Sequence, residues 1–215
     1  MSRRYDCSDP QQRAEGIEQA AQAARRGELV VLPTDTVYGI GCDAFKPAGV
    51  ADLLAAKGRG RDMPVPVLVG SARTVSGLTG WLSFAGERLT EAFWPGALTI
   101  VIRQAASLAW DLGDTDGSVA VRMPLHPVAI ELLNLVGPMA VSSANRSGEP
   151  PATTADQAQD QLGDAVAVYL DGGQCRAPVP STIVDVTQPV PRVLRIGALS
   201  VEQLREVCPD LEAAE

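Results

Sequence analysis

The sequence predicts a single α/β domain with a twisted sheet of mixed parallel and antiparallel strands, flanked by helices. Its 215 residues suit one large domain. Strand and helix patterns alternate in the first half of the chain, and strands dominate the second half. We expect the domain to span residues 9–208 and the acidic tail, residues 209–215, to be disordered.

The first half of the chain carries clear start and stop signals for helices. Ser8, Asp9 and Pro10 form a typical helix start, and Gly27 ends the helix that follows. Residues 71–93 are expected to be helical in two pieces. The other elements expected here are a strand at 29–32, a helix at 47–56 and a strand at 65–69.

The second half is richer in strands. The patterns predict strands at 97–103, 118–124, 139–142, 165–170, 182–186 and 192–196, and a helix at 127–135. Two capping boxes, Thr154 with Gln157 and Ser200 with Gln203, predict the starts of two further helices.

Charge and cysteine usage exclude several classes of protein. The net charge of −8 argues against broad binding to nucleic acids or anionic membranes. The four cysteines form no C-x-x-C pair and the chain has one histidine, which excludes a zinc site and favours unpaired thiols in a reducing compartment. No signal peptide and no apolar run of membrane-spanning length is present, so we expect a cytoplasmic protein.

Polar residues cluster directly after three of the predicted strands. In the stretch VVLPTDTVYGIG, residues 30–41, the apolar strand runs into a Pro-Thr-Asp-Thr sequence. Similar clusters are SSAN at 142–145 and RIG at 195–197. Each cluster alone is typical of an ordinary turn. Together, at the carboxyl ends of strands in an α/β sheet, they predict a ligand site.

Four cations lie where an acidic protein would not place them without a reason. Lys57 and Arg59 alternate with glycine in AAKGRGRDMP, and Arg122 and Arg195 lie in or at the end of apolar strands. One such cation could simply complement a helix C-terminus. A cation within a buried strand is costly unless it is paired or faces a ligand. The four therefore predict a site for a polyphosphate or a carboxylate.

Other familiar chemistries are missing from the sequence. It contains no phosphate-binding P-loop and no dinucleotide fingerprint. We interpret His126 as a loop or cap residue rather than as part of a catalytic triad. Residues 114–117 faintly resemble a calcium loop, but no glutamate closes it. With no evident covalent nucleophile, the chemistry best predicted is a reaction between bound substrates, aided by positioning and charge stabilisation.

Six segments occur in an order that resembles a known family. They are PTDTVYGIG, KGR, VAVRMPLHP, SSANRSGEPPAT, STIVD and VLRIGALS, within residues 27–200. The chain resembles the YrdC/TsaC family, the L-threonylcarbamoyladenylate synthases. The resemblance implies a YrdC-like, DHBP synthase-like fold. It also implies formation of threonylcarbamoyl-AMP, pyrophosphate and water from L-threonine, bicarbonate and ATP. The product would pass to tRNA threonylcarbamoyl transferase proteins that make N6-threonylcarbamoyladenosine.

The resemblance also implies roles for individual residues. Four would contact L-threonine, namely Thr36, Arg122, Ser143 and Ser181. Six would contact ATP, namely Lys57, Arg59, Ser118, Asn145, Thr153 and Arg195. Lys57 and Arg59 would also be catalytic, because they would spread the charge that develops on the phosphates. Mg²⁺ would accompany ATP, with no metal ligand from the protein.

Two departures from the family pattern and two alternative functions stand beside this interpretation. Gly60 occupies the place where the family usually has proline, and Leu68-Val69 the place where it often has histidine, so no contacts are assigned within 61–69.

The alternative functions are an RNA-binding or ribosome-maturation protein without catalysis, and a carbamoyltransferase-type domain. The acidic charge argues against RNA binding, including direct contact with tRNA. The lack of cysteine pairs argues against the carbamoyltransferase.

Overall fold

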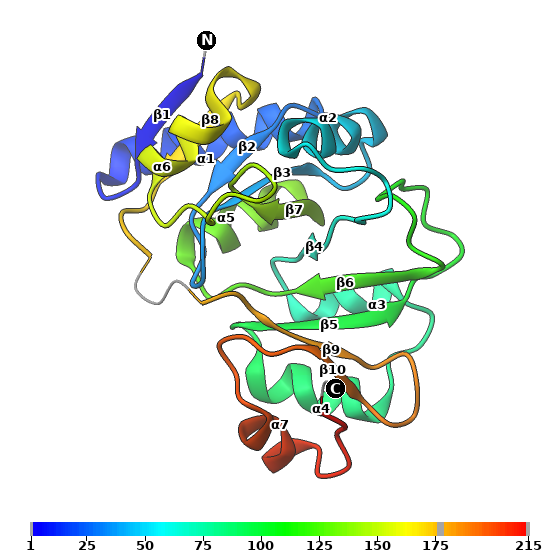
Figure 1. The fold of residues 1–215 in the computed structure, drawn as a ribbon. Helices are drawn as coiled ribbons and strands as arrows, with labels where there is room; N and C mark the ends of the chain where they lie inside the picture. Colours follow the sequence, from blue (N-terminus) through cyan, green and yellow to red (C-terminus); the bar gives the residue numbers. More distant parts are fainter. Residues whose placement is uncertain (1, 176–178, 214–215) are drawn as a thin grey trace.

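The computed structural model describes residues 2–175 and 179–213, and it confirms the predicted α/β fold with a mixed sheet. The described strands form one ten-stranded sheet in the order β1-β8-β2-β3-β7-β4-β6-β5-β9-β10 (Figure 1). The strands are β1 (Arg3–Asp6), β2 (Val30–Leu32), β3 (Gly39–Asp43), β4 (Val67–Leu68), β5 (Leu98–Arg103), β6 (Ser118–Arg122), β7 (Met139–Ser143), β8 (Val168–Asp171), β9 (Thr182–Asp185) and β10 (Arg192–Arg195).

Helices cover the sheet and connect its strands. They are α1 (Pro10–Arg25), α2 (Pro47–Lys57), α3 (Val75–Leu78), α4 (Phe84–Phe93), α5 (Pro127–Val136), α6 (Ala155–Leu162) and α7 (Val201–Val207), with short 3₁₀ turns at Ala72–Thr74 and Gly163–Ala165. Asp9 caps α1 by accepting from the amides of Gln11 and Gln12. The predicted capping box is present at the start of α7. At α6 Thr154 caps the helix, but Gln157 reaches back to the amide of Thr153 instead.

Two strands were not predicted, for different reasons. β3 has the sequence GIGCD, and glycine is rare in strands. Glycine is needed at position 41 because a Cβ there would lie 2.3 Å from the carbonyl oxygen of Ala140 on the neighbouring strand. β1 is a short polar segment, RRYD, that pairs in parallel with β8 at the edge of the sheet.

Packed residues extend beyond the predicted domain limits at both ends. β1 lies before residue 9 and belongs to the sheet. After residue 208, Leu211 is buried and the backbone of Glu212 bonds with that of Val193 and Pro191. The prediction of a disordered tail is therefore wrong for residues 209–213. Its last two positions, 214 and 215, lie outside the described residues.

The core is divided between the two sides of the sheet. On one side α1 and α5 pack on each other and on the strands around β2 and β8, through small residues of α1 such as Ala20 and Ala24. The other side, under α2, α4 and α7, contains the larger cluster. All four cysteines are unpaired, as predicted, and all four are buried. No helix among residues 2–175 and 179–213 is long and apolar enough to cross a membrane.

Tyr38 fixes the segment between β2 and β3. The Tyr38 side chain is fully buried, and its hydroxyl donates to the carbonyl of Gly173 at 2.6 Å and accepts from the amide of Gly172 at 3.0 Å. Its backbone bonds with Ala152 and Ala144. The loop 33–38 is therefore attached to three other segments and presents its polar side chains in a fixed arrangement.

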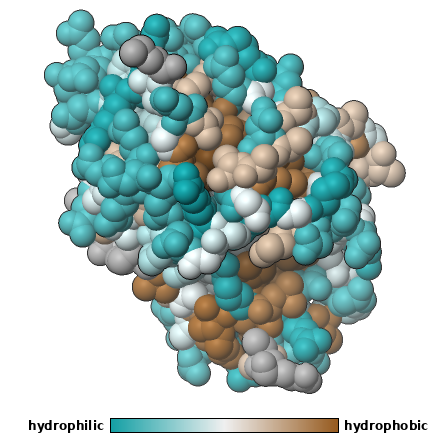
Figure 2. All heavy atoms as spheres, turned by 45° about the horizontal axis from the view of Figure 1, so that its top comes forward, coloured by the Kyte–Doolittle hydropathy of each residue, from teal (hydrophilic) through white to brown (hydrophobic). Residues whose placement is uncertain are grey.

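Figure 2 shows one face of the molecule, on which hydrophobic residues gather in two places that hydrophilic residues surround.

Candidate active site

A cavity of about 490 Å³ brings together side chains from segments that are far apart in the sequence. Its walls come from the β2–β3 loop, the segment after α2, the ends of β6 and β7, and the strands β5, β9 and β10. Six of the ten predicted site residues line it, namely Thr36, Arg59, Arg122, Ser143, Ser181 and Arg195. The sequence therefore identified a group of polar residues that the fold collects around one cavity.

Arg122 stands at the end of β6, with its guanidinium held on three sides. Its Nε donates to the carbonyl of Gly96 at 2.9 Å, Nη1 to Thr36 Oγ1 at 2.9 Å and Nη2 to Asp35 Oδ1 at 2.7 Å. Arg122 is 6% exposed. Burial lowers its pKa, and the carboxylate of Asp35 opposes that shift, so the guanidinium keeps its charge. Arg122 thus enters the cavity already paired with a counter-charge.

The hydroxyl groups beside Arg122 have a defined polarity. Thr34 Oγ1 donates its one hydrogen to the carbonyl of Val37, at 2.6 Å. In the 3.0 Å contact between Thr34 and Thr36, Thr36 must then be the donor. Because Thr36 Oγ1 also receives the bond from Arg122, its only free capacity is as an acceptor. Thr36 therefore offers a lone pair to a donor such as an amine or a hydroxyl.

Arg195, at the end of β10, also lines the cavity and has different partners from Arg122. A register shift in the β9–β10 ladder between Val193 and Arg195 redirects the strand here. Arg195 Nη2 and Nε donate to the carbonyl of Ser181 at 2.7 and 3.2 Å, and the Ser181 hydroxyl lies 2.8 Å from that of Thr99. Within the described part of the chain Arg195 has no carboxylate partner. Burial lowers the pKa of this guanidinium.

Arg59 and Lys57, two residues apart, go to different places. Gly58 ends α2 in the left-handed conformation, with φ of 65°. Arg59 reaches the cavity and donates to the hydroxyls of Ser147 at 3.1 Å and Ser142 at 3.3 Å. The side chain of Lys57 does not line the cavity. Its Nζ donates to the backbone carbonyls of Ser143 and, at 2.7 Å, Asn145.

Lys57 is an unusual buried cation. It is 1% exposed, and burial, with a smaller contribution from Arg59, lowers its pKa to about 7. Its own carbonyl accepts from the amide of Ser147 at 2.9 Å. Lys57 thus fixes the loop after β7 through both its side chain and its backbone.

Three other predicted residues lie outside the lining of the cavity. Ser118 begins β6, four residues from Arg122, and donates to the carbonyl of Thr115. The Asn145 side chain ties together the loop through Arg146 and Glu149, and its buried Oδ1 has no partner among the described residues. Thr153 donates to the side chain of Gln157.

Sequence reasoning missed other parts of the cavity. Asp62, Met63, Pro64, Pro66 and Leu68 line it, within the stretch that departs from the family pattern. Asp35 was within the quoted motif but received no role, although a carboxylate is the expected partner for a buried arginine.

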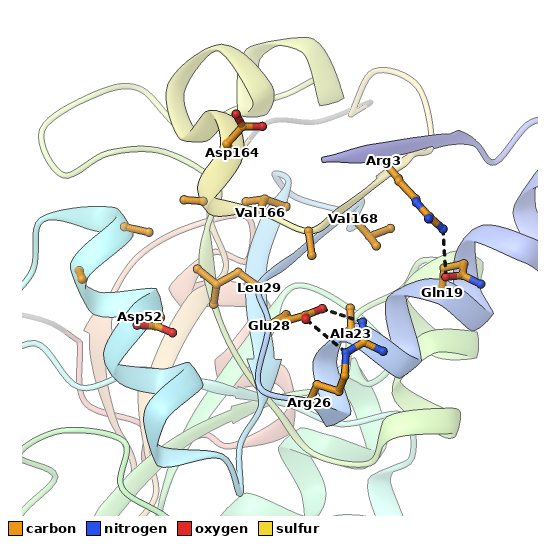
Figure 3. A pocket seen from close by; sticks show the side chains of 14 residues that line it. Arg3, Gln19, Ala23, Arg26, Glu28, Leu29, Asp52, Asp164, Val166 and Val168 are labelled. Carbon is orange, nitrogen blue, oxygen red and sulfur yellow. Dashed lines mark hydrogen bonds and ion pairs between the residues drawn. The ribbon is translucent and has the colours of Figure 1, made fainter. Parts of the chain in front are cut away.

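A larger groove than this cavity lies elsewhere in the described part of the chain. It has a volume of about 720 Å³ and lies between α1, α2 and the segment leading into β8 (Figure 3). No predicted site residue lines it. Charged residues around it are engaged locally, as in the ion pair of Arg26 with Glu28 and the contact of Arg3 with Gln19. Its volume alone therefore gives no reason to place a functional site in this groove.

Comparisons with known proteins show the family to which the chain belongs. Residues 22–197 match the family Sua5_yciO_yrdC, described as "Telomere recombination". A Mycobacterium tuberculosis protein, named provisionally as a threonylcarbamoyl-AMP synthase, is 60% identical over 207 residues, which are 96% of this chain and 95% of that protein. The chain belongs to the Sua5/YciO/YrdC family. This confirms the resemblance found in the six sequence segments.

Solved structures of similar proteins have the same fold as this chain. Sua5 of Pyrococcus abyssi complexed with L-threonine has a TM-score of 0.88 and 32% identity. That match covers 100% of this chain but 62% of the Sua5 chain, so the present chain spans less than two thirds of that relative. YciO of E. coli has a TM-score of 0.83 over 95% of this chain, and its 24% identity supports the fold alone.

Proposed function

We propose that this chain is a threonylcarbamoyl-AMP synthase that uses L-threonine, bicarbonate and ATP. Its strongest support is the 60% identity to the mycobacterial relative across 96% of the chain. The cavity adds a physical reason, because it combines one neutralised arginine with two arginines that lack a carboxylate partner among the described residues. Such a site suits one small zwitterion and one polyanion.

Threonine would bind at the wall that carries Arg122. Three of the five N–H groups of that guanidinium are used by the protein, which leaves one on each Nη for a carboxylate. Thr36 would accept a hydrogen bond from the amine or hydroxyl of the substrate. Ser143 and Ser181 would complete the pocket, from β7 and from the start of β9.

The phosphates of ATP would bind at Arg59 and Arg195. Both guanidiniums bond to neutral oxygens and retain donors that an anion can use. Lys57 would act mainly by holding the loop after β7, with a direct phosphate contact requiring its Nζ to leave two carbonyls. Ser118, Asn145 and Thr153 would contribute to the nucleotide site only if ATP extends beyond the lining of the cavity.

The proposed reaction has two steps. The amine of threonine first captures bicarbonate as a carbamate, with loss of water. A carbamate oxygen then attacks the α-phosphorus of ATP, a P–O bond forms, and pyrophosphate leaves. Arg59 and Arg195 would stabilise the charge that develops on the phosphate oxygens.

A magnesium ion fits this site as a companion of ATP rather than as a resident metal. No group of three or more acidic, histidine or cysteine side chains gathers anywhere in the described part of the chain. Asp62 is the one acidic residue among the described residues that line the cavity, and Mg²⁺ typically takes one or two carboxylates together with substrate phosphates. Bound there, the ion would neutralise charge on the triphosphate.

The product would pass to downstream tRNA threonylcarbamoyl transferase proteins in the cytoplasm. A mixed acid anhydride such as this adenylate is prone to hydrolysis, so rapid transfer to a partner suits the chemistry. The net charge of −8 argues against tRNA being bound by this chain itself.

Pyrophosphate release from ATP by the purified protein tests the proposal. We expect release that requires both L-threonine and bicarbonate. Release without threonine, or none with all three substrates and magnesium, would contradict it. Filter binding of tRNA at physiological salt separates the RNA-binding alternative, which predicts retention.

A further inference from the structure

Asp35 is separated from the candidate active site by the chain segment to which it belongs. It lines a second cavity of about 440 Å³, together with residues such as His126 and Cys175. It does not line the 490 Å³ cavity, whereas Thr36, the next residue, does. Thr34 lines both cavities. The segment 34–36 is therefore a partition, with Asp35 on its far side.

The carboxylate of Asp35 nevertheless controls a group inside the active site. Its Oδ1 accepts from Arg122 Nη2 at 2.7 Å and from the amide of Leu125 at 2.8 Å. The second bond ties this carboxylate to the backbone that follows β6, so both ends of the contact are fixed. The Arg122 side chain is 7% exposed and that of Asp35 16% exposed, which limits screening of the pair by water.

We propose that Asp35 is a positioning residue for L-threonine, acting through Arg122 from outside the substrate cavity. This rests on the proposed function. The carboxylate has two opposed effects. It orients the guanidinium so that the free N–H on each Nη is presented in one plane, which favours binding of a carboxylate. Its negative charge also offsets part of the attraction between Arg122 and that carboxylate, which weakens binding and eases product release.

Two substitutions separate orientation from charge. In Asp35→Asn the side-chain oxygen can still accept from both Arg122 and Leu125, but the negative charge is gone. In Asp35→Ala both the oxygen and the charge are lost. Glu131→Gln is a matched control, because Glu131 pairs with Arg13 between α5 and α1 and lines neither cavity.

Calorimetric titration with L-threonine alone is the test, followed by KM and kcat in the pyrophosphate assay. We expect Asp35→Asn to bind threonine at least as tightly as the wild type, Asp35→Ala to bind on the order of 10–100-fold more weakly, and Glu131→Gln to be unchanged. The effect should fall on KM for threonine, with KM for ATP unaltered. Thermal unfolding of each variant shows whether it is folded.

Two outcomes would overturn the proposal. If Asp35→Asn loses as much affinity as Asp35→Ala, the negative charge itself is needed, and an oxygen that only orients Arg122 does not account for binding. If both variants bind as the wild type does, Asp35 has no part in recognition. Failure of the proposed function would look different, because the wild type itself would then release no pyrophosphate with threonine.

Discussion

The arginines that line the cavity are held in two opposite ways. Arg122 is buried, paired with the carboxylate of Asp35 and bonded on three sides. Arg59 is half-buried and Arg195 is exposed, and both bond only to carbonyl or hydroxyl oxygens. Their positive charges are not neutralised by a carboxylate among the described residues and are available to an anion that arrives later. Arg122 is preorganised for shape, whereas Arg59 and Arg195 supply charge.

The same substitution at Arg122 and at Arg195 should therefore lower the free energy of unfolding by different amounts. Arg122→Met leaves the carboxylate of Asp35 buried without its cation, and we expect the free energy of unfolding to fall by about 3–5 kcal/mol. Arg195→Met leaves only a neutral carbonyl unsatisfied, and we expect a loss of about 1 kcal/mol. Urea denaturation measures both. Equal losses of unfolding free energy would contradict the difference between Arg122 and Arg195.

The next largest effect concerns catalysis. Arg59→Ala should reduce the rate of pyrophosphate release by about 10²–10³, because a stabiliser of phosphate charge is removed. Stability should change little. The control is Arg61→Ala, two residues away, whose side chain pairs with exposed Asp111 and does not line the cavity. A rate for Arg59→Ala within a few-fold of that control would remove Arg59 from the phosphate site.

These expectations also show what the sequence could predict. It identified Arg122 and Arg195 because cations in or at the end of apolar strands need a reason, and Arg59 because it alternates with glycine and a second cation in one loop. Neither argument depends on the fold. It did not predict β3, since the glycines that permit close approach to β7 look like a loop in one dimension.

Partners in space were harder to foresee than residue types. Asp35 and Arg122 are 87 residues apart in the chain, and nothing local joins them. Lys57 illustrates the same limit. Its place at the end of a helix before a glycine predicted a phosphate ligand, but the direction of its side chain depends on where the loop after β7 passes.

Substrate selectivity tests whether the Thr36 hydroxyl, beside Arg122, acts as an acceptor. Thr36 can only accept, so it favours a substrate that offers an O–H or N–H at that point. Serine lacks one methyl group. We expect its kcat/KM to be lower than that of threonine by a factor that corresponds to about 1–3 kcal/mol of transition-state binding. Alanine lacks the hydroxyl and should be rejected more strongly than serine. Equal use of alanine and serine would show that no group in the cavity recognises the hydroxyl.

A smaller, pH-dependent effect is expected from Lys57. Its pKa of about 7 in the folded protein lies below the 10.5 of free lysine, so the unfolded chain binds more protons between these values. The free energy of unfolding of the wild type should therefore rise with pH relative to Lys57→Met above about pH 7, by at most about 1.4 kcal/mol per pH unit. A neutral amine still has two N–H groups for the two carbonyls. Denaturation at pH 7 and pH 9 checks this, and a difference that does not change with pH would contradict it.

The central claim, that Arg122 binds threonine while Arg59 and Arg195 bind phosphates, is tested most directly by calorimetry on Arg59→Met. Separate titrations with L-threonine and with a non-hydrolysable ATP analogue would be compared with those of the wild type. The account predicts that affinity for the analogue falls at least about tenfold, the loss of about 1.4 kcal/mol. Affinity for threonine should be unchanged, because Arg59 bonds to Ser142 and Ser147 and to no residue of the threonine pocket. Loss of threonine binding with unchanged affinity for the analogue would contradict this division of roles.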